Sequence, residues 1–272
     1  MILSVVIITH NEEANIGRTL ASVQSLVADG KGEIIVVDSG STDLTVEIAK
    51  SFGAKVFIEK WKGYAAQKNS AIDKSTGDWI LSLDADEELS NAARDFTLDF
   101  LSGRLGTLFA DFDGVRFSRR NYFLGRWIRF GGFYPDPKLR LFRRGSGLFE
   151  ERLVHEDVHL KPGKKAFDPS VQYDERTDFY LLHHSYPTLT DYIDHVNRYS
   201  SLGAEMAVAK GHRGFSLFNI VVRPIATFIY NYFLRLGFLD GREGLLFHLY
   251  HAVYVSWKYA KAWELARQNK SL

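Results

Sequence analysis

The chain has 272 residues, of which 46% are hydrophobic and 25% charged, so it can fold around a sizeable core, and disorder of the whole chain is excluded. It contains no cysteine, which excludes disulfide bonds and zinc sites built on cysteine. The formal net charge is +1, but between Arg116 and Arg152 ten basic residues stand against three acidic ones, which favours an anionic partner for that stretch.

Short apolar strands and helices alternate through the first part of the chain. The opening residues, MILSVVIITHNEE, lack a basic region before the apolar run, so we expect a strand here and not a signal peptide. Strands are expected at residues 4–9, 34–37, 55–58 and 79–83. Helices are expected between them, one capped by Asn11, one capped by Ser41 or Thr42, and one over residues 64–74. Such alternation predicts βαβ units in a mostly parallel sheet, with ligands beyond the carboxyl ends of the strands.

Acidic residues crowd the end of the fourth predicted strand, in the stretch GDWILSLDADEEL. Asp84, Asp86, Glu87 and Glu88 repel one another, and a bound cation would relieve that repulsion. A solvated acidic turn that opens a helix at Glu87 is the alternative.

Four segments at the predicted strands, SVVIITHNEE, EIIVVDSGSTD, KGYAAQKNSAI and GDWILSLDADEEL, follow in the order and spacing of a known family. They resemble the nucleotide-sugar-binding half of family 2 inverting glycosyltransferases with the GT-A fold. The resemblance implies a Rossmann-like α/β fold with a mostly parallel central sheet flanked by helices. The chain has neither the G-x-G-x-x-G fingerprint of dinucleotide sites nor the G-x-x-x-x-G-K-[ST] fingerprint of P-loops.

The resemblance also implies roles for residues at the strand ends. Nucleotide-sugar binding is expected from Thr9, Asn11, Glu12, Asp38, Lys62, Lys68 and Asp84, and binding of Mg²⁺ or Mn²⁺ from Asp86. Simpler roles stay open: Thr9 and Asn11 as a strand end and helix cap, Asp38 as the cap of its own turn, and Lys68 on a solvated helix face. Glu87 and Glu88 are expected to have no role.

The segment from Val115 to Val158 is similar to a narrower branch of the family. Its RxNYxxG, GGxYPDxxLRLFRR and VHE patterns resemble lipopolysaccharide core glycosyltransferases that add β-linked glucose. The resemblance assigns acceptor binding to Arg119, Arg120, Arg129 and Arg140, although internal ion pairs would explain some of them.

The resemblance also implies a catalytic base and a second metal ligand further along the chain. Glu156 is preferred as the base, with Asp157 as its substitute. In the pair His183-His184, adjacent side chains of a strand cannot point into one site, and His184 is preferred as the metal ligand.

The last third of the chain is predicted to be helical. Residues 188–209 have the spacing of an amphipathic helix. Residues 215–238 are rich in apolar side chains, but Arg223, Pro224 and Arg235 interrupt them, which favours a helix in the plane of a membrane surface over one that spans it. Residues 245–265 mix aromatic and basic side chains in the same way. Packing on the catalytic domain or on a second subunit is the alternative.

These observations predict three regions: a nucleotide-sugar half (1–113), an acceptor and base half (114–186) and a C-terminal helical region (187–272). We expect a cytoplasmic enzyme at the inner face of the cell membrane. It would move a hexose from a UDP-sugar to a lipid-linked saccharide such as lipopolysaccharide core. A sugar nucleotidyltransferase and a noncatalytic, membrane-associated nucleotide-sugar-binding protein are the alternatives. A homodimer stays open, and nucleic acid is not an expected partner.

Overall fold

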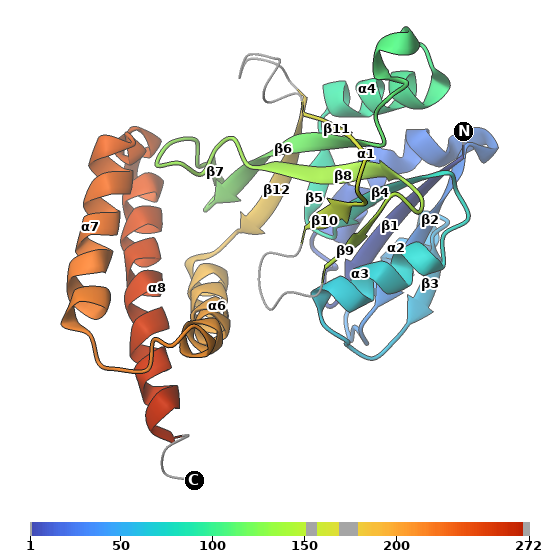
Figure 1. The fold of residues 1–272 in the computed structure, drawn as a ribbon. Coiled ribbons are helices and arrows are strands. Elements are labelled where there is room, and N and C mark those ends of the chain that lie inside the picture. The colour runs from blue at the N-terminus through green and yellow to red at the C-terminus, as the bar shows by residue number, and fades with distance from the viewer. Residues whose placement is uncertain (1, 151–156, 169–178, 269–272) are drawn as a thin grey trace. The chain divides into compact units, whose positions relative to one another are not determined.

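A computed structural model describes residues 2–150, 157–168 and 179–268 (Figure 1). Contacts divide these residues into two compact units. Unit 1 takes in the described residues up to 120 together with those from 136 to 183, and unit 2 takes in 121–135 and those from 184 onward. The predicted division at residues 113 and 186 concerns functional roles and stays a prediction.

Four parallel strands form the first half of the main sheet, in the order β3-β2-β1-β4. They are β1 (Leu3–Thr9), β2 (Gly32–Asp38), β3 (Lys55–Ile58) and β4 (Trp79–Asp84). Each matches a predicted strand to within two residues, because continuous apolar runs favour strands that are covered on both faces. The α/β prediction is confirmed.

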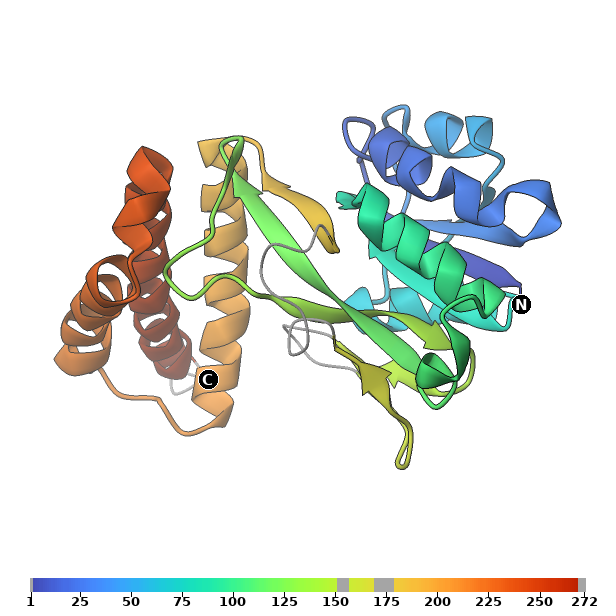
Figure 2. The ribbon, with the colours of Figure 1, turned by 90° about the horizontal axis from the view of Figure 1, so that it is seen from above.

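Helices cover both faces of these strands. They are α1 (Ile16–Val27), α2 (Thr45–Ser51), α3 (Tyr64–Asp73) and α4 (Asn91–Ser102). Alternate residues of β1 point to opposite sides: Ile7 packs in the core that contains Leu20 of α1, and Val6 packs in the core that contains Ile72 of α3. In Figure 2, α1 (blue) and α4 (green) lie together.

The sheet continues beyond β4 in the order β4-β8-β6-β12-β5. Strand β8 is antiparallel to both β4 and β6, and β5 is antiparallel to β12, so the sheet is mixed as a whole. These strands are β5 (Glu87–Leu89), β6 (Gly114–Phe123), β8 (Pro137–Arg143) and β12 (Tyr180–Tyr186). Short strands β7 (Arg126–Trp127) and β11 (Ala166–Phe167) pair with β6, while β9 (Gly147–Phe149) and β10 (Val158–Leu160) form a separate pair. The alternative of a helix beginning at Glu87 is wrong, because Glu87 lies in β5 opposite His183 of β12.

Both predicted helix caps after β1 and β2 are wrong. Helix α1 begins at Ile16, and Asn11 instead adopts a left-handed backbone, with φ of 54°. Its side-chain oxygen accepts a hydrogen bond from the backbone N–H of Thr42 at 2.8 Å. Helix α2 begins only at Thr45, after a turn in which the Asp43 carboxylate accepts the Thr45 N–H at 3.1 Å. The two loops satisfy each other's polar groups, so the helices start several residues later than local capping rules predict.

Unit 2 is mostly helical, as predicted. It contains α6 (Leu189–Ala209), α7 (Arg223–Ile229) and α8 (Gly241–Gln268), and Thr188 and Asp191 form a capping box at the start of α6. Turns of π-helix at Phe218–Val222 and Tyr230–Leu234 extend α7 at both ends. Helix α8 packs against both α6 and α7 (Figure 1). Among the residues that the structure describes, no helix has the length and apolar character needed to cross a bilayer.

Candidate active site

The ends of β1, β2 and β4 bring three predicted site residues to one edge of the sheet. In the parallel register, Thr9 lies opposite Asp38, and Ile8 lies opposite Asp84. This is the carboxyl edge, where open α/β sheets bind their ligands.

Asp84 lies between two buried cations. Its Oδ1 is 2.7 Å from Lys68 Nζ, and its Oδ2 is 2.6 Å from Arg140 Nη2. The side chains of Lys68 and Arg140 are each only 4% exposed, so the idea that Lys68 lies on a solvated face is wrong. Burial alone would raise the pKa of Asp84, but the neighbouring cations, Arg140 first, hold it well below its usual range.

Glu87, for which the sequence predicted no role, belongs to this site. Its side chain is fully buried and accepts hydrogen bonds from Arg140 Nη2 at 2.6 Å and from Arg119 Nη1 at 3.3 Å. Its other carboxylate oxygen accepts the backbone N–H of Asp84 at 3.1 Å. Glu87 therefore neutralises two arginines and holds the turn that follows β4. The cluster of acidic residues from Asp84 to Glu88 indicated a charged site, but no local pattern showed that Glu87 and not Glu88 belongs to it.

The four predicted acceptor arginines have different surroundings. Arg119 and Arg140 form internal ion pairs, and Arg119 also binds Asp136 at 2.6 Å. The Arg120 guanidinium stacks on the Tyr180 ring at 3.4 Å from its centre, and Arg129 lies in unit 2 beside the rings of Trp127 and Phe130. The contacts of Arg119 and Arg140 are those of the internal ion-pair alternative.

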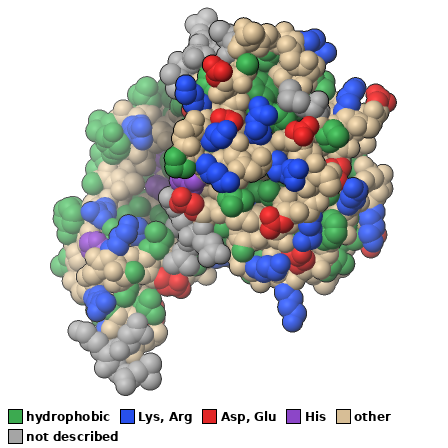
Figure 3. All heavy atoms as spheres, turned by 45° about the vertical axis from the view of Figure 1, so that its right-hand side comes forward, with side chains coloured by type: hydrophobic (Ala, Val, Ile, Leu, Met, Phe, Trp, Pro, Cys, Tyr) green, Lys and Arg blue, Asp and Glu red, His purple; other side chains and the backbone are tan. Residues whose placement is uncertain are grey.

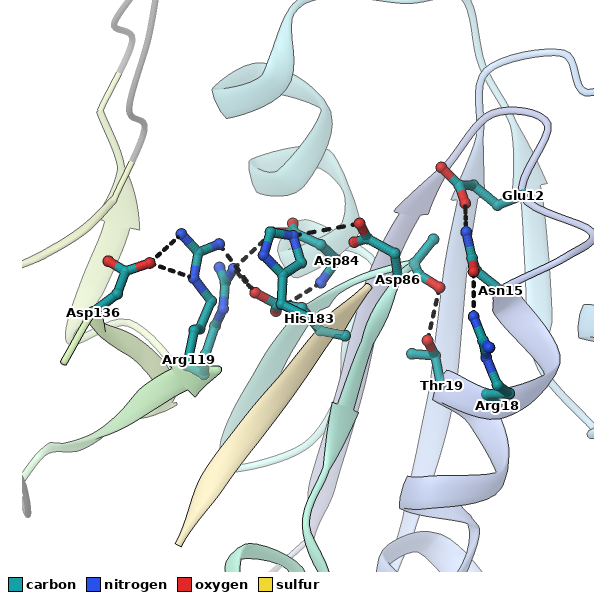
Figure 4. Close-up of polar contacts among 12 residues, drawn as sticks. Glu12, Asn15, Arg18, Thr19, Asp84, Asp86, Arg119, Asp136 and His183 are labelled. Carbon is teal, nitrogen blue, oxygen red and sulfur yellow. Dashed lines mark hydrogen bonds and ion pairs between the residues drawn. The ribbon is translucent and has the colours of Figure 1, made fainter. Parts of the chain in front are cut away.

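Asp86 is joined by a histidine from β12. The Nε2 atom of His183 lies 3.3 Å from Asp86 Oδ2 (Figure 4). The expected ligand, His184, does not lie beside Asp86: successive side chains of a strand point to opposite faces, and His184 stacks on Tyr122 in unit 2. Which histidine binds a metal stays a prediction. Burial would raise the pKa of Asp86, but His183 lowers it below its usual value.

Helix α1 supports the Asp84–Asp86 turn. The buried hydroxyl of Thr19 donates a hydrogen bond to the Ala85 carbonyl at 2.7 Å (Figure 4). Glu12 lies nearby, and its pKa is raised to about 7 by burial and by the carboxylates of Asp86, Asp43 and Asp84, although a hydrogen bond from Asn15 opposes this. Burial is the larger cause, and the neighbouring carboxylates add to it.

Asp38 caps its own turn, the simpler of the two roles considered for it. Its Oδ1 accepts the backbone N–H groups of Gly40 and Ser41 at 2.8 Å each, and its Oδ2 accepts the Ser41 hydroxyl. Gly40 has φ of 92°, a conformation that glycine adopts without strain.

Two other polar groups at this edge have unused hydrogen-bonding capacity. Thr9 is 5% exposed and Gln67 of α3 is fully buried. Within the described residues, Thr9 Oγ1 and Gln67 Oε1 make no hydrogen bond, while the Gln67 amide nitrogen lies 3.3 Å from Ser39 Oγ. Buried polar atoms of this kind usually have partners, so a bound ligand is a natural source of them. Gln67 was not predicted, because a single glutamine in a helix carries no signal.

The remaining predicted residues are placed as follows. Lys62 is 48% exposed and pairs with Glu59 at 2.8 Å. Asp157 lies 3.9 Å from Arg116. Glu156, the preferred base, lies outside the described residues.

The arrangement around Asp86 can contribute to a metal site but does not complete one. No cluster of three or more His, Asp or Glu side chains within the described ranges could hold a metal ion. Mg²⁺ and Mn²⁺ need few protein ligands when phosphate oxygens and water supply the others. Asp86 and His183 fit that chemistry, as a carboxylate and an imidazole in contact at the ligand-binding edge.

Known proteins resemble this chain over most of its length. Residues 4–144, more than half of the chain, match glycosyl transferase family 2. An uncharacterized glycosyltransferase of Rickettsia typhi is 32% identical over 286 aligned residues, which cover 99% of this chain and 89% of that protein. The lipopolysaccharide core biosynthesis glycosyltransferase LpsC of Rhizobium meliloti is 32% identical over 250 residues, which cover 88% and 82%.

A solved structure has the same fold. The mannosyltransferase PcManGT of Pyrobaculum calidifontis, in complex with GDP-Man and Mn²⁺, is similar with a TM-score of 0.54 and 18% identity, over 98% of this chain and 86% of that one. The family match, the two relatives and the shared fold agree with the motifs at the strand ends. The chain is therefore a member of glycosyl transferase family 2.

Proposed function

We propose that the protein is an inverting, metal-dependent glycosyltransferase that moves a hexose, glucose in the first instance, from a UDP-sugar to a lipid-linked saccharide. The observation that carries the proposal is the Asp86–His183 pair beside Asp84, at the carboxyl edge of the parallel strands. Similarity to LpsC, which acts in lipopolysaccharide core biosynthesis, supports an acceptor of that class.

The donor would bind across the ends of β1, β2 and β4. Thr9 Oγ1 and Gln67 Oε1, which have no hydrogen-bond partner among the described residues, would meet the nucleobase, close to Asp38. Asn11 and Glu12 follow Thr9 in the same loop. The fixed cations Lys68 and Arg140 would add positive potential close to the diphosphate while they orient Asp84. Lys62, which is exposed, would contribute to donor binding by long-range attraction only.

Asp86 and His183 would hold Mg²⁺ or Mn²⁺, which neutralises charge on the departing diphosphate when bound. His183 takes the role that His184 was expected to have. The acceptor hydroxyl must lose a proton as it attacks the anomeric carbon, and we assign that proton to the carboxylate of Glu156, with Asp157 as the substitute. A single displacement would invert the configuration at that carbon. Arg120 and Arg129 remain the arginines proposed to bind the acceptor.

A lipid-linked acceptor places the reaction at a membrane surface, and we propose the cytoplasmic face. Of the two alternatives, a nucleotidyltransferase is disfavoured by membership of glycosyl transferase family 2. A noncatalytic binding protein would have no need for the Asp86–His183 pair. Measuring UDP release with an acceptor distinguishes it from an enzyme.

Replacing Asp86 with Ala tests the proposal. The variant should lose metal-dependent turnover of UDP-glucose by about 100-fold or more, because the diphosphate loses its counter-charge. Release of UDP in the presence of an acceptor extract is the measurement. Asp95→Ala, an exposed aspartate on α4, is the matched control and should keep wild-type turnover.

Full activity in the Asp86→Ala variant would refute the metal assignment. UDP release that no acceptor stimulates in the wild-type protein would refute the transferase.

A further inference from the structure

Unit 2 exposes an unusual amount of hydrophobic surface in one stretch. Most of the large hydrophobic side chains that are exposed in the described residues lie between Phe215 and Leu249. We call residues 215–239 the apolar segment. Within it, Phe218 is 60% exposed, Phe233 53% and Leu234 71%. Large contiguous apolar surfaces on soluble domains usually mark an interaction site.

The exposed side chains repeat along one side of the helix formed by α7 and its π-helical ends. Their spacing of three or four residues keeps them on one face. They are Phe218, Val222, Ile225, Ile229 and Phe233. A different face of the same helix packs on α8, where the Ile220 carbonyl accepts the Ser256 hydroxyl at 2.8 Å and Arg223 bonds to the Tyr259 hydroxyl. The face that carries Phe218 and Phe233 is therefore exposed to solvent, while a different face of the helix packs on α8.

The charges carried by the apolar segment and by the five residues before it are of one sign. Residues 210–239 contain four Lys and Arg residues and no acidic residue. Lys210 and Arg213 are exposed at the start of this stretch, and Figure 3 shows green hydrophobic and blue basic side chains side by side on the helical unit. Cations around an apolar face complement the anionic headgroup layer of a bilayer. They oppose a second copy of the same face, because like charges would meet.

We propose that the apolar segment seats in the headgroup layer of an anionic lipid bilayer, with the helix in the plane of the membrane. The phenylalanine and branched side chains enter the acyl boundary, and the basic residues bind lipid phosphates. The inference deepens the proposed function and rests on it for the acceptor. An enzyme bound to the bilayer would lie on the same surface as a lipid-linked saccharide.

The loop that carries part of the predicted acceptor pattern is built onto this segment. The backbone N–H of Gly131 donates to the Arg235 carbonyl at 2.9 Å. Asp240, which is 2% exposed, accepts the backbone N–H groups of Phe130 at 2.8 Å and Arg129 at 3.2 Å. All of these residues belong to unit 2. A unit that seats on the bilayer would therefore carry this loop to the membrane surface, where the saccharide of the acceptor begins.

Flotation of the full chain with vesicles tests the proposal. Vesicles of phosphatidylcholine with phosphatidylglycerol are compared with vesicles of phosphatidylcholine alone, without sugar donor. We expect binding to the anionic vesicles that added salt weakens. The double variant Phe218→Ser and Phe233→Ser should lower the partition coefficient roughly tenfold or more. The matched control, Ile58→Ser with Leu148→Ser, removes exposed hydrophobic side chains from unit 1 and should bind as the wild type does.

A second variant, Lys210→Glu with Arg213→Glu, changes only exposed charges and should weaken binding to the anionic vesicles. Equal loss in the control pair, absence of wild-type binding, or a homodimer that the Phe218 and Phe233 variant dissociates in sedimentation would each overturn the proposal. Flotation needs no donor, so it tests the docking surface independently of turnover. A protein that binds the vesicles but shows no UDP-sugar turnover in the separate UDP-release assay would refute the proposed function and leave the docking surface intact.

Discussion

Glu87 shows at the scale of one residue how this site is held together. Its carboxylate is fully buried and compensates two guanidinium groups, Arg140 and Arg119. Arg140 and Arg119 keep Asp84 and Asp136 as partners in Glu87→Gln, which weakens only their charge-assisted hydrogen bonds to residue 87. The variant should therefore lower the free energy of unfolding by about 1.5–3 kcal/mol. Urea denaturation measures this. Glu88→Gln is the control, since Glu88 is 23% exposed and lies 3.5 Å from an exposed Arg18, an arrangement worth about 1 kcal/mol or less. Similar losses in the two variants would contradict the role given to Glu87.

Glu33 acts at the scale of elements, because it joins the four parallel strands near their amino ends. Its carboxylate binds Ser4 of β1 and Lys55 of β3, and it accepts two hydrogen bonds from Thr76 before β4. Burial would raise the pKa of Glu33, but these hydrogen bonds, that from Lys55 first, lower it from 4.5 to about 2.

The folded state therefore releases this proton more readily than the unfolded state does. Glu33 stabilises the fold above pH 4.5 and loses that contribution as the pH falls toward 2, by at most about 3 kcal/mol. Glu33→Gln should flatten the dependence of the free energy of unfolding on pH in that window, measured by urea denaturation between pH 5 and pH 3. The exposed Glu47 provides a control, and Glu47→Gln should keep the wild-type slope.

Donor binding should be visible at the scale of the whole molecule. A ligand that binds only the folded state stabilises it by roughly 3 kcal/mol at a concentration 100 times its Kd. We expect UDP-glucose with Mn²⁺ to raise the midpoint of thermal unfolding more than GDP- or dTDP-sugars do. In the Asp86→Ala variant, adding Mn²⁺ should no longer increase the rise in the unfolding midpoint that UDP-glucose causes. A larger shift with GDP-sugars would move the donor assignment away from uridine.

The sequence by itself determined the parallel strands, the helices of unit 2 and the edge at which Thr9, Asp38 and Asp84 meet. Apolar periodicity and strand polarity are encoded by neighbours a few residues apart, so both can be read locally. Similarity of the motifs was enough to assign the family.

Only the tertiary structure decided which charges pair and which residues are buried. Lys68, Arg140 and Glu87 come from α3, β8 and β5, and their contacts depend on how β8 and β12 align with the rest of the sheet. The same alignment places His183 rather than His184 beside Asp86. The contact of Asn11 was likewise not predictable from neighbouring residues, because its partner, Thr42, lies in a different loop. Long-range register is set by the packing of the whole core, and no local pattern in the chain contains it.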